Sequence, residues 1–442
     1  MPTSEACSAK PTLAKVREHR NCGGRRLVAS SVVEMRVGFL FNHEQIHQVA
    51  HSLPIAMALA RRGFAGEIIV ATTNERLAAE VRRLGEPLVG THIEHVHLGL
   101  RPGTARVSRL LGGLLPAARA LVYRDNLDFF RSLDVLVVAE KTSLLLRRLH
   151  GLRRPLLVHT RHGAGDRAIG FDKASAEFDH VLCSGSKIRE RLIREAGVSP
   201  ARISVVGYPK FDIAKPTVQL MHALPARPVV LYNPHSSPHL SSWYRHGREV
   251  LDFFVDNEDY HLIFAPHVML FERRFVVSID RLRIAAAGRL DRRYLRSPNI
   301  HIDLGSRACT DMSYTLAADI YLGDASSQVY EYLNRPRPCL FLNSHGRRWL
   351  HDPSFGHWLA GPVIESPGEL ARGLEQAVAT HRRQYLQVQQ TMCARTFEPS
   401  DRPASLRAAE ALLRFLAGNG GANRDAAAIP GARIASGGMG SS

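Results

Sequence analysis

The sequence predicts an α/β protein built from two tandem Rossmann-like domains with a central cleft between them. Three observations support this prediction. Short apolar runs alternate with amphipathic segments through residues 35–206, as in a parallel sheet covered by helices on both faces. A weakly periodic, proline-punctuated stretch follows from Pro209 to Pro228. The alternation then begins again at Val229, so a second sheet of the same kind is expected.

The expected elements follow from where these apolar runs begin and end. In the first half, strands are expected at residues 35–41, 67–71, 134–139, 155–159, 181–183 and 203–206, with helices ending at residue 60 and spanning 74–84. In the second half, the expected strands are 229–232, 261–265, 300–302, 320–322 and 339–342, and the expected helices are 248–255, 367–385 and 404–417.

These elements divide the chain into five expected parts. Residues 1–34 are polar, basic and aperiodic, which predicts a disordered arm or a mis-assigned start. An N-terminal α/β domain is expected over 35–212, a linker over 213–228 and a C-terminal α/β domain over 229–417. Residues 418–442 are rich in Gly, Ala and Ser, which predicts a disordered tail.

The net charge of +17 is the compositional outlier. Such a charge indicates an anionic partner, which is nucleic acid, a membrane surface or a phosphate-rich substrate. The chain has no nucleic-acid-binding motif and little aromatic interleaving, so we expect no nucleic-acid partner. No apolar run approaches the roughly 18 residues that span a bilayer, and the N-terminus has no apolar signal core. We therefore expect a cytoplasmic protein, with peripheral contact to an anionic membrane left open.

The most informative stretch is Asp319–Leu333, in which an apolar run meets a turn and then an amphipathic pattern. It predicts a buried strand, a tight turn beginning at Gly323 and the first turn of a helix. Backbone N–H groups and the hydroxyls of Ser326 and Ser327 would face a phosphate there, and Glu331 would face a ribose. The alternative is that one of these serines is only an N-cap.

A literal H-E-x-x-H motif, His43-Glu44-Gln45-Ile46-His47, comes directly after the first strand. On a helix, such a pair of histidines binds zinc with the glutamate as base. No third ligand follows at a suitable distance, so we expect a loop at the cleft in which His43, Glu44 or His47 contacts an acceptor. The six cysteines are scattered without a CxxC pair, and the sequence predicts no metal site, no disulfide framework and no cofactor.

Four further loops carry polar side chains where a predicted strand ends. They contain Arg161-His162-Gly163, Tyr208-Pro209-Lys210, Asn233-Pro234-His235 and Pro266-His267. A histidine at a strand end, followed by glycine, is placed for acid–base chemistry, with a structural histidine as the alternative. Because the carboxyl ends of parallel strands meet at one edge of a sheet, the loops together predict a phosphate-binding cleft.

The order of these pieces resembles the CDP-glycerol glycerophosphotransferase family, the teichoic-acid-type polymerases and primases, over residues 150–345. The corresponding segments are Arg161-His162-Gly163, then Gly207-Tyr208-Pro209-Lys210-Phe211-Asp212, Tyr232-Asn233-Pro234, Pro266-His267-Val268 and Gly323-Asp324-Ala325-Ser326-Ser327. This chain has Arg161 where the family has Trp and Lys210 where it has Arg, and Lys keeps the charge without the bidentate fork. The resemblance implies a GT-B fold.

The resemblance also implies roles for individual residues. The catalytic residues would be His162, as the general base, and His267, which would stabilise charge on the phosphates. The donor, a CDP-alcohol or a nucleotide sugar, would be bound by Lys210, Asn233, His235, Asp324, Ser326, Ser327 and Glu331. The acceptor would be an anionic, lipid-linked or polysaccharide hydroxyl on the side of His43, Glu44 and His47. The N-terminal domain would then be the acceptor side and the C-terminal domain the donor side.

Two other enzymatic functions stay open on the same fold. One is a glycosyltransferase that uses a nucleotide sugar, and the other is an isomerase of the sugar-nucleotide 2-epimerase type. A non-enzymatic basic binding protein is the third alternative, and it leaves the ordered strand-end loops unexplained. Product analysis separates the enzymatic alternatives.

Overall fold

The structure is a computed structural model that describes residues 35–42, 46–85, 93–110, 115–161, 163–214, 226–272, 275–278 and 283–420. These residues belong to one compact unit. The predicted arm, most of the predicted linker and tail, and the predicted site residues His43, Glu44 and His162 lie outside the described residues.

The first half of the chain forms a parallel sheet with the strand order β3-β2-β1-β4-β5-β6-β7 in its described part. Its strands are β1 (Arg36–Phe41), β2 (Glu67–Thr72), β3 (Ile93–His97), β4 (Val135–Val138), β5 (Leu156–His159), β6 (His180–Cys183) and β7 (Ile203–Val205). Val37 and Phe39 pack in one apolar cluster, and Leu40 packs in another. Both faces of the sheet are therefore buried, as its apolar runs predict.

The second half forms a parallel sheet with the order β12-β9-β8-β13-β14-β15. Its strands are β8 (Val229–Asn233), β9 (His261–Phe264), β12 (Ile300–Ile302), β13 (Ile320–Gly323), β14 (Cys339–Leu342) and β15 (Val363–Ile364). Both sheets start in the middle, extend to one edge and then return to extend to the other, as Rossmann-like folds do. The predicted fold class of two Rossmann-like α/β units is confirmed.

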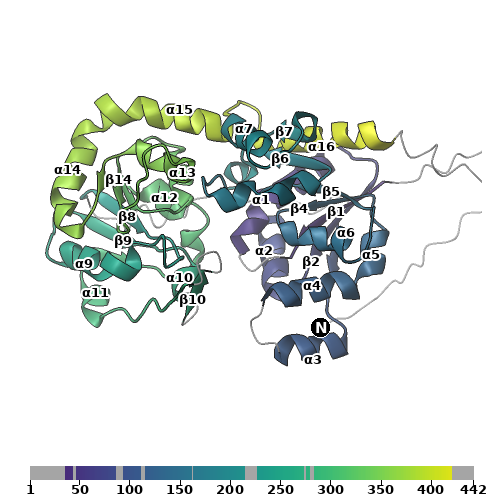
Figure 1. Ribbon diagram of the computed structural model, residues 1–442, viewed down its shortest axis with the longest axis horizontal. Coiled ribbons are helices and arrows are strands. Elements are labelled where there is room, and N and C mark those ends of the chain that lie inside the picture. The colour runs from purple at the N-terminus through teal and green to yellow at the C-terminus, as the bar shows by residue number, and fades with distance from the viewer. Residues whose placement is uncertain are drawn as a thin grey trace, which may run out of the picture. The chain divides into compact units, whose positions relative to one another are not determined.

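Helices cover these sheets (Figure 1). They are α1 (Val49–Arg61), α2 (Glu75–Gly85), α3 (Pro102–Leu110), α4 (Leu115–Asp125), α5 (Leu127–Arg131), α6 (Leu145–Arg148), α7 (Ser186–Arg194), α9 (Trp243–Val255), α10 (Met269–Glu272), α11 (Arg292–Arg296), α12 (Ser313–Ala317), α13 (Gln328–Leu333), α14 (Leu370–Thr380), α15 (Leu386–Phe397) and α16 (Ala404–Gly420). Short 3-10 helices that bear on the site are η1 (Ile46–Gln48), η7 (Pro209–Asp212) and η10 (Pro353–Ala360). No described helix is long and apolar enough to cross a bilayer.

The last helix, α16, departs from the expected domain division. We expected residues 404–417 to belong with the second sheet, but Ala408, Leu412 and Leu416 are buried in the cluster that contains α1 and β1. The chain therefore returns to the first sheet at its end, because the apolar face of α16 fits the face of α1. The other domain boundaries stay a prediction.

Several other elements differ from those expected from the sequence. Strand β3 is an edge strand with mostly polar, partly exposed side chains, so it has no apolar run. The antiparallel pair β10 (Val276–Ser278) and β11 (Arg283–Ala285) is only three residues long on each side. The expected helix over 367–385 instead continues from α14 through a π-helical turn, His381–Tyr385, into α15.

The strand order reverses between β8 and β13 in the second sheet, since the chain leaves these neighbours toward opposite edges. In such sheets, ligands bind in the crevice outside the carboxyl ends of the strands at this switch point. The loops that follow β8 and β13 contain Asn233–His235 and Asp324–Ser327, so the fold brings two of the predicted loops to the expected binding position.

Candidate active site

A cleft of about 340 Å³ lies at this edge and is lined by loops that follow strands of both sheets. Seven of the predicted site residues line it: His47, Lys210, His235, His267, Ser326, Ser327 and Glu331. Two described predictions, Asn233 and Asp324, do not line it. The structure therefore brings most of the described candidates together around one cavity.

Asp324 and Asn233 instead hold the surrounding loops. The buried carboxylate of Asp324 accepts hydrogen bonds from the backbone N–H of His235 at 2.9 Å and from the backbone and hydroxyl of Ser242 at 2.6 and 2.8 Å. The Asn233 side chain donates to the Ala265 carbonyl at 2.6 Å. Each bond joins two of the strand-end loops. Asp324 and Asn233 therefore hold the loops that carry the cleft residues without lining the cleft themselves.

His235 and His267 lie side by side because of the strand register. Strands β8 and β9 pair in parallel with Tyr232 opposite Phe264. Tyr232 is followed by Asn233-Pro234-His235, and Phe264 is followed by Ala265-Pro266-His267. The histidines thus occupy equivalent positions, each three residues after its member of the Tyr232–Phe264 pair, and their ring centroids lie 5.6 Å apart. Sequence spacing alone could not show that the two Pro-His pairs meet.

Backbone hydrogen bonds fix the tautomers of both rings. The N–H of Ser237 donates to His235 Nδ1 at 2.9 Å, and the N–H of Met269 donates to His267 Nδ1 at 3.3 Å. Burial, together with the nearby Arg167 guanidinium, lowers the pKa of His235 well below its ordinary value and that of His267 to about 4. Both rings are therefore neutral at pH 7, and each carries its proton on Nε2 as a donor.

Arg167 adds a third donor to this group. Its Nη1 lies 3.3 Å from His235 Nε2. Because Ser237 makes Nε2 the protonated nitrogen, both atoms are donors, and they do not hydrogen-bond each other. A phosphate oxygen between them would accept from both, so Arg167, His235 and His267 together form a cluster of donors suited to an anion.

A buried ion pair forms the next part of the cleft wall. Lys210 Nζ donates to Glu331 Oε1 at 2.7 Å, and the Tyr208 hydroxyl donates to the same oxygen at 3.1 Å. Burial, with the charge of Glu331, raises the pKa of Tyr208 well above its ordinary value, so this phenol stays a donor. Glu331 Oε2 is buried without a hydrogen-bond partner in the described structure. This oxygen is placed to accept from a ligand hydroxyl.

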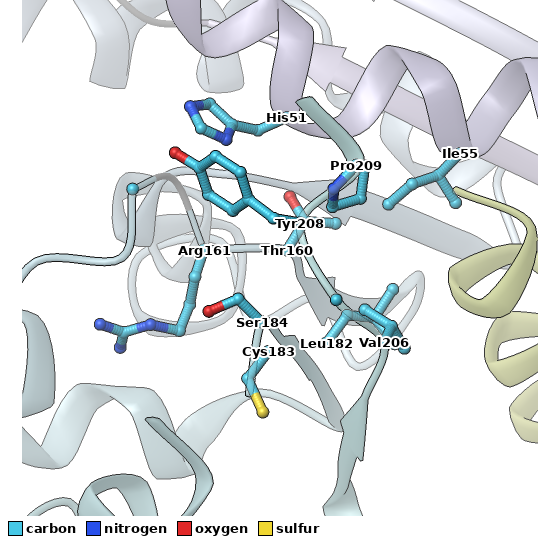
Figure 2. A pocket seen from close by; sticks show the side chains of 12 residues that line it. His51, Ile55, Thr160, Arg161, Leu182, Cys183, Ser184, Val206, Tyr208 and Pro209 are labelled. Atoms are coloured by element: carbon cyan, nitrogen blue, oxygen red, sulfur yellow. The ribbon is translucent and has the colours of Figure 1, made fainter. Parts of the chain in front are cut away.

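The Tyr208 ring packs against His51. A cavity of only about 10 Å³ lies beside the cleft and shares His51, Arg161 and Tyr208 with it. Figure 2 shows the His51 ring beside that of Tyr208, and the ring centroids are 5.1 Å apart in an edge-on arrangement. The packing holds the hydroxyl of Tyr208 toward Glu331.

The loop after β5 is strained and packs closely against the turn after β13. Arg161 has a φ of 34°, which is unusual for a residue other than glycine and stores strain of about 1–3 kcal/mol. Its guanidinium lies 4.4 Å from the centroid of the Phe171 ring, and burial lowers its pKa to about 10. A Cβ added at Gly165 would lie 2.7 Å from Cβ of Ser327. Glycine is therefore needed where this loop meets the turn.

The two serines of the turn differ in their hydrogen bonds. Ser326 is buried, and its Oγ accepts from the N–H of Gln328 at a long 3.4 Å. Ser327 is exposed and makes no side-chain cap bond to α13, which has six residues. The alternative of a simple N-cap thus fits Ser326 weakly and does not fit Ser327.

Of the H-E-x-x-H motif, the structure describes Ile46 and His47. His47 lies on η1 and lines the cleft, ahead of α1 rather than on it. Within the described residues, no group of three His, Cys, Asp or Glu side chains is placed to hold a metal. Cys183 and Cys339 are buried, free thiols.

Arg167 is the main cleft residue that the sequence prediction missed. It follows the predicted His162 loop by a few residues, and Gly163 and Gly165 before it mark a close backbone approach. Those glycines were a usable signal, but its approach to His235, 68 residues later, depends on the fold.

Comparisons with known proteins identify the fold. No protein-family model matches the chain, and no curated protein matches it. Among solved structures, the wall teichoic acid polymerase TagF is similar with a TM-score of 0.53 and 14% identity, over 87% of this chain and 90% of TagF. A UDP-N-acetylglucosamine 2-epimerase is similar with a TM-score of 0.51 and 12% identity, over 91% of this chain and 100% of the epimerase. The UDP-GlcNAc 2-epimerase of Neisseria meningitidis, bound to UDP-GlcNAc, is similar with a TM-score of 0.50 and 11% identity, over 87% of this chain and 100% of that epimerase. At these identities the likeness shows the fold alone, and that fold is shared by a polymerase and by epimerases.

The buried Lys210–Glu331 pair makes a testable prediction for stability. Lys210→Met leaves the Glu331 carboxylate buried without its cation, so the free energy of unfolding should fall by about 3–5 kcal/mol. The double variant Lys210→Met/Glu331→Gln should recover part of this loss because it removes both charges. Urea denaturation measures both values.

Lys141→Met is the matched control, because Lys141 pairs with Asp172 at 2.8 Å on the surface. It should lower the free energy of unfolding by no more than about 1 kcal/mol. Equal losses in Lys141→Met and Lys210→Met would contradict a buried, tightly coupled pair.

Proposed function

We propose that the protein is a transferase that moves an alditol-phosphate unit, such as glycerophosphate, from a CDP-activated donor to an acceptor hydroxyl and releases CMP. The observation that carries the proposal is the convergence of Arg167, His235 and His267 as donors on one cleft. A pyrophosphate is the kind of group that needs several fixed donors in a confined space. The resemblance of the ordered loops to the glycerophosphotransferase family supports the choice of cytidine.

In the proposed reaction, the acceptor oxygen attacks the β-phosphorus of the donor. A new phosphodiester bond forms as the bond between the β-phosphorus and the bridging oxygen breaks, and CMP leaves with the electron pair. The acceptor proton passes to His162 in the role that the resemblance implies. Arg167 and the Nε2–H groups of His235 and His267 stabilise charge on the two phosphates. Catalysis then rests on positioning and fixed donors.

The remaining cleft residues fit the two sides of this reaction. The unpartnered Oε2 of Glu331 would accept from a ribose hydroxyl, while Lys210 donates to the other oxygen, Oε1. Ser327 is exposed to the cleft and would contact the phosphates together with Ser326. Asn233 and Asp324 would act through the loops they hold. On the acceptor side, His47 lines the cleft, and His43 and Glu44 keep their proposed role there.

The fold does not distinguish this proposal from the two alternatives, because polymerase and epimerase structures match it about equally. The cleft chemistry favours transfer. A 2-epimerase needs carboxylates around the sugar ring, and Glu331 is the one carboxylate among the described residues that line the cleft. A glycosyltransferase that uses a nucleotide sugar would need the same phosphate donors and remains the second candidate.

The charge of the whole chain bears on the acceptor. A net charge of +17 would draw the protein toward anionic, lipid-linked or polysaccharide acceptors and toward an anionic membrane surface. We therefore propose an anionic acceptor at the inner face of a cell membrane. We propose no nucleic-acid partner, because the sequence has no nucleic-acid-binding motif.

Nucleotide binding tests the donor side of the proposal. CDP and CDP-glycerol at about 100 times their dissociation constants should each raise the free energy of unfolding by roughly 2.7 kcal/mol. UDP at the same concentration should raise it much less. Arg167→Ala should weaken CDP binding by about tenfold to hundredfold, as expected for a lost charge-assisted hydrogen bond. Thermal shift and calorimetry measure both effects. Arg296→Ala, an exposed arginine away from the cleft, is the control. A preference for UDP, or no response to any nucleotide, would contradict the proposal.

The proposed base makes a separate prediction for turnover. His162→Ala should lower the rate of CMP release by about 10²–10⁴-fold, the usual contribution of one acid–base group. Its affinity for CDP should change little, because the donor cluster is intact. His150→Ala, which removes a histidine outside the cleft lining, should turn over normally. Equal losses of binding and turnover in His162→Ala would count against the assignment as base.

A further inference from the structure

A second polar cluster lies behind the cleft, around the buried carboxylate of Asp166. Lys187 Nζ donates to Oδ1 at 2.8 Å, and the backbone N–H of His357 donates to Oδ2 at 3.1 Å. The hydroxyl of Tyr330 donates to the same Oδ2. Asp166 and Lys187 belong to the half of the chain with the first sheet, whereas Tyr330 on α13 and His357 on η10 belong to the second. The carboxylate therefore bonds elements of both halves.

This carboxylate is held in its ionised form. Burial acts to raise the pKa of Asp166, but the hydrogen bond from His357 and the positive charge of Lys187 outweigh it and hold the pKa below its ordinary value. Asp166 is 4% exposed and does not line the cleft. The proposed reaction gives it no direct role, so its ion pair needs another explanation.

The cluster continues to the turn at the switch point. His357 Nδ1 lies 3.4 Å from Asp166 Oδ2, and its Nε2 donates to the backbone carbonyl of Asp324 at 2.9 Å. Trp358 Nε1 donates to the same carbonyl at 2.6 Å. The carboxylate of Asp324 in turn holds the backbone N–H of His235. A continuous chain of hydrogen bonds thus connects Asp166 to the loop that carries His235.

Asp166 is also the neighbour of Arg167 in the sequence. The Asp166 side chain lies in this cluster, while the Arg167 side chain lines the cleft with its Nη1 3.3 Å from His235 Nε2. Arg191 Nη1 holds the backbone carbonyl of Asp166 at 2.6 Å, so main chain and side chain are both anchored. One end of this series of hydrogen bonds is Asp166, next to Arg167, and the other end is the backbone of His235. The series therefore fixes the position of Arg167 relative to His235.

We infer that Asp166 is a positioning residue, which through His357 and Asp324 holds the Arg167 guanidinium beside His235 so that both face one phosphate group. The inference rests on the proposed function, because it assigns the two donors to a nucleoside diphosphate. It adds that the halves of the chain are tied directly behind the phosphate site, and that this tie sets the affinity for the diphosphate and not for the nucleoside.

The first test compares CDP with cytidine as ligands. Asp166→Asn keeps the shape of the side chain but removes its charge, so the affinity for CDP should fall by about tenfold or more. Cytidine, measured by competition, should bind Asp166→Asn and the wild type equally. Asp172→Asn is the matched control, since Asp172 is an exposed acid of the same connection and pairs with Lys141. The inference is overturned if Asp166→Asn binds CDP as the wild type does, or loses cytidine and CDP affinity in equal proportion.

A paired variant separates positioning from folding. Asp166→Asn/Lys187→Met removes both buried charges, so its thermal midpoint should recover most of what Asp166→Asn loses. Its ratio of CDP to cytidine affinity should stay low, because the tie to His357 is still weakened. Recovery of that ratio together with the midpoint would overturn the inference and leave Asp166 a purely structural residue.

A ligand-free measurement keeps this inference distinct from the proposed function. If Asp166 and His357 form one tie, the thermal midpoint of Asp166→Asn/His357→Gln should lie well above the value expected from adding the two single losses. Additive losses would overturn the tie even if CDP binds. If the wild-type protein does not bind CDP, the proposed function is contradicted. A non-additive midpoint in the double variant would still support the tie between Asp166 and His357.

Discussion

The site depends on the buried carboxylate of Asp324, which joins the loops on both sides of the switch point. It accepts bonds from His235 and Ser242 in the connection after β8, although it belongs to the turn after β13. Burial raises its pKa, and backbone and hydroxyl donors of Ser242 and His235 oppose that effect. A carboxylate without these donors would be costly to bury, so loop geometry and carboxylate position depend on each other. The donors of the cleft are fixed as a consequence.

The same constraint explains why the two Pro-His pairs matter. Adjacent parallel strands in register place equivalent loop residues next to each other, so a repeated strand-end pattern becomes a pair of aligned rings. Each ring then uses Nδ1 to accept from its own loop, which leaves Nε2–H for a ligand. With Arg167 brought in from the first half, three donor side chains converge on one cleft, as the proposed diphosphate site requires. Donors whose positions are fixed by their own loops are what electrostatic stabilisation of a phosphate group requires.

Much of this could be predicted from the sequence, for physical reasons that differ between elements. Buried parallel strands such as β8 and β13 are continuous apolar runs, and Gly323 to Ser327 has the composition of a turn, so the fold and this turn were predictable. Strand β3 and helix α16 were missed or misplaced because edge strands are partly polar and because an amphipathic helix does not specify which sheet it covers. Arg167 and Asp166 acquire their roles from partners 68 and 191 residues away, which local pattern cannot show. The domain boundaries and the roles of individual site residues remain predictions.

Product analysis tests the central claim most directly. The purified protein would be incubated with membranes as a source of acceptor and with labelled CDP-glycerol or labelled UDP-N-acetylglucosamine in parallel. We predict that CDP-glycerol yields CMP in equal amount to label in a phosphodiester-linked product, and that His162→Ala suppresses both. Free nucleotide with a glycoside from the UDP-sugar, or an isomerised UDP-sugar, together with unreacted CDP-glycerol, would contradict the proposed transferase.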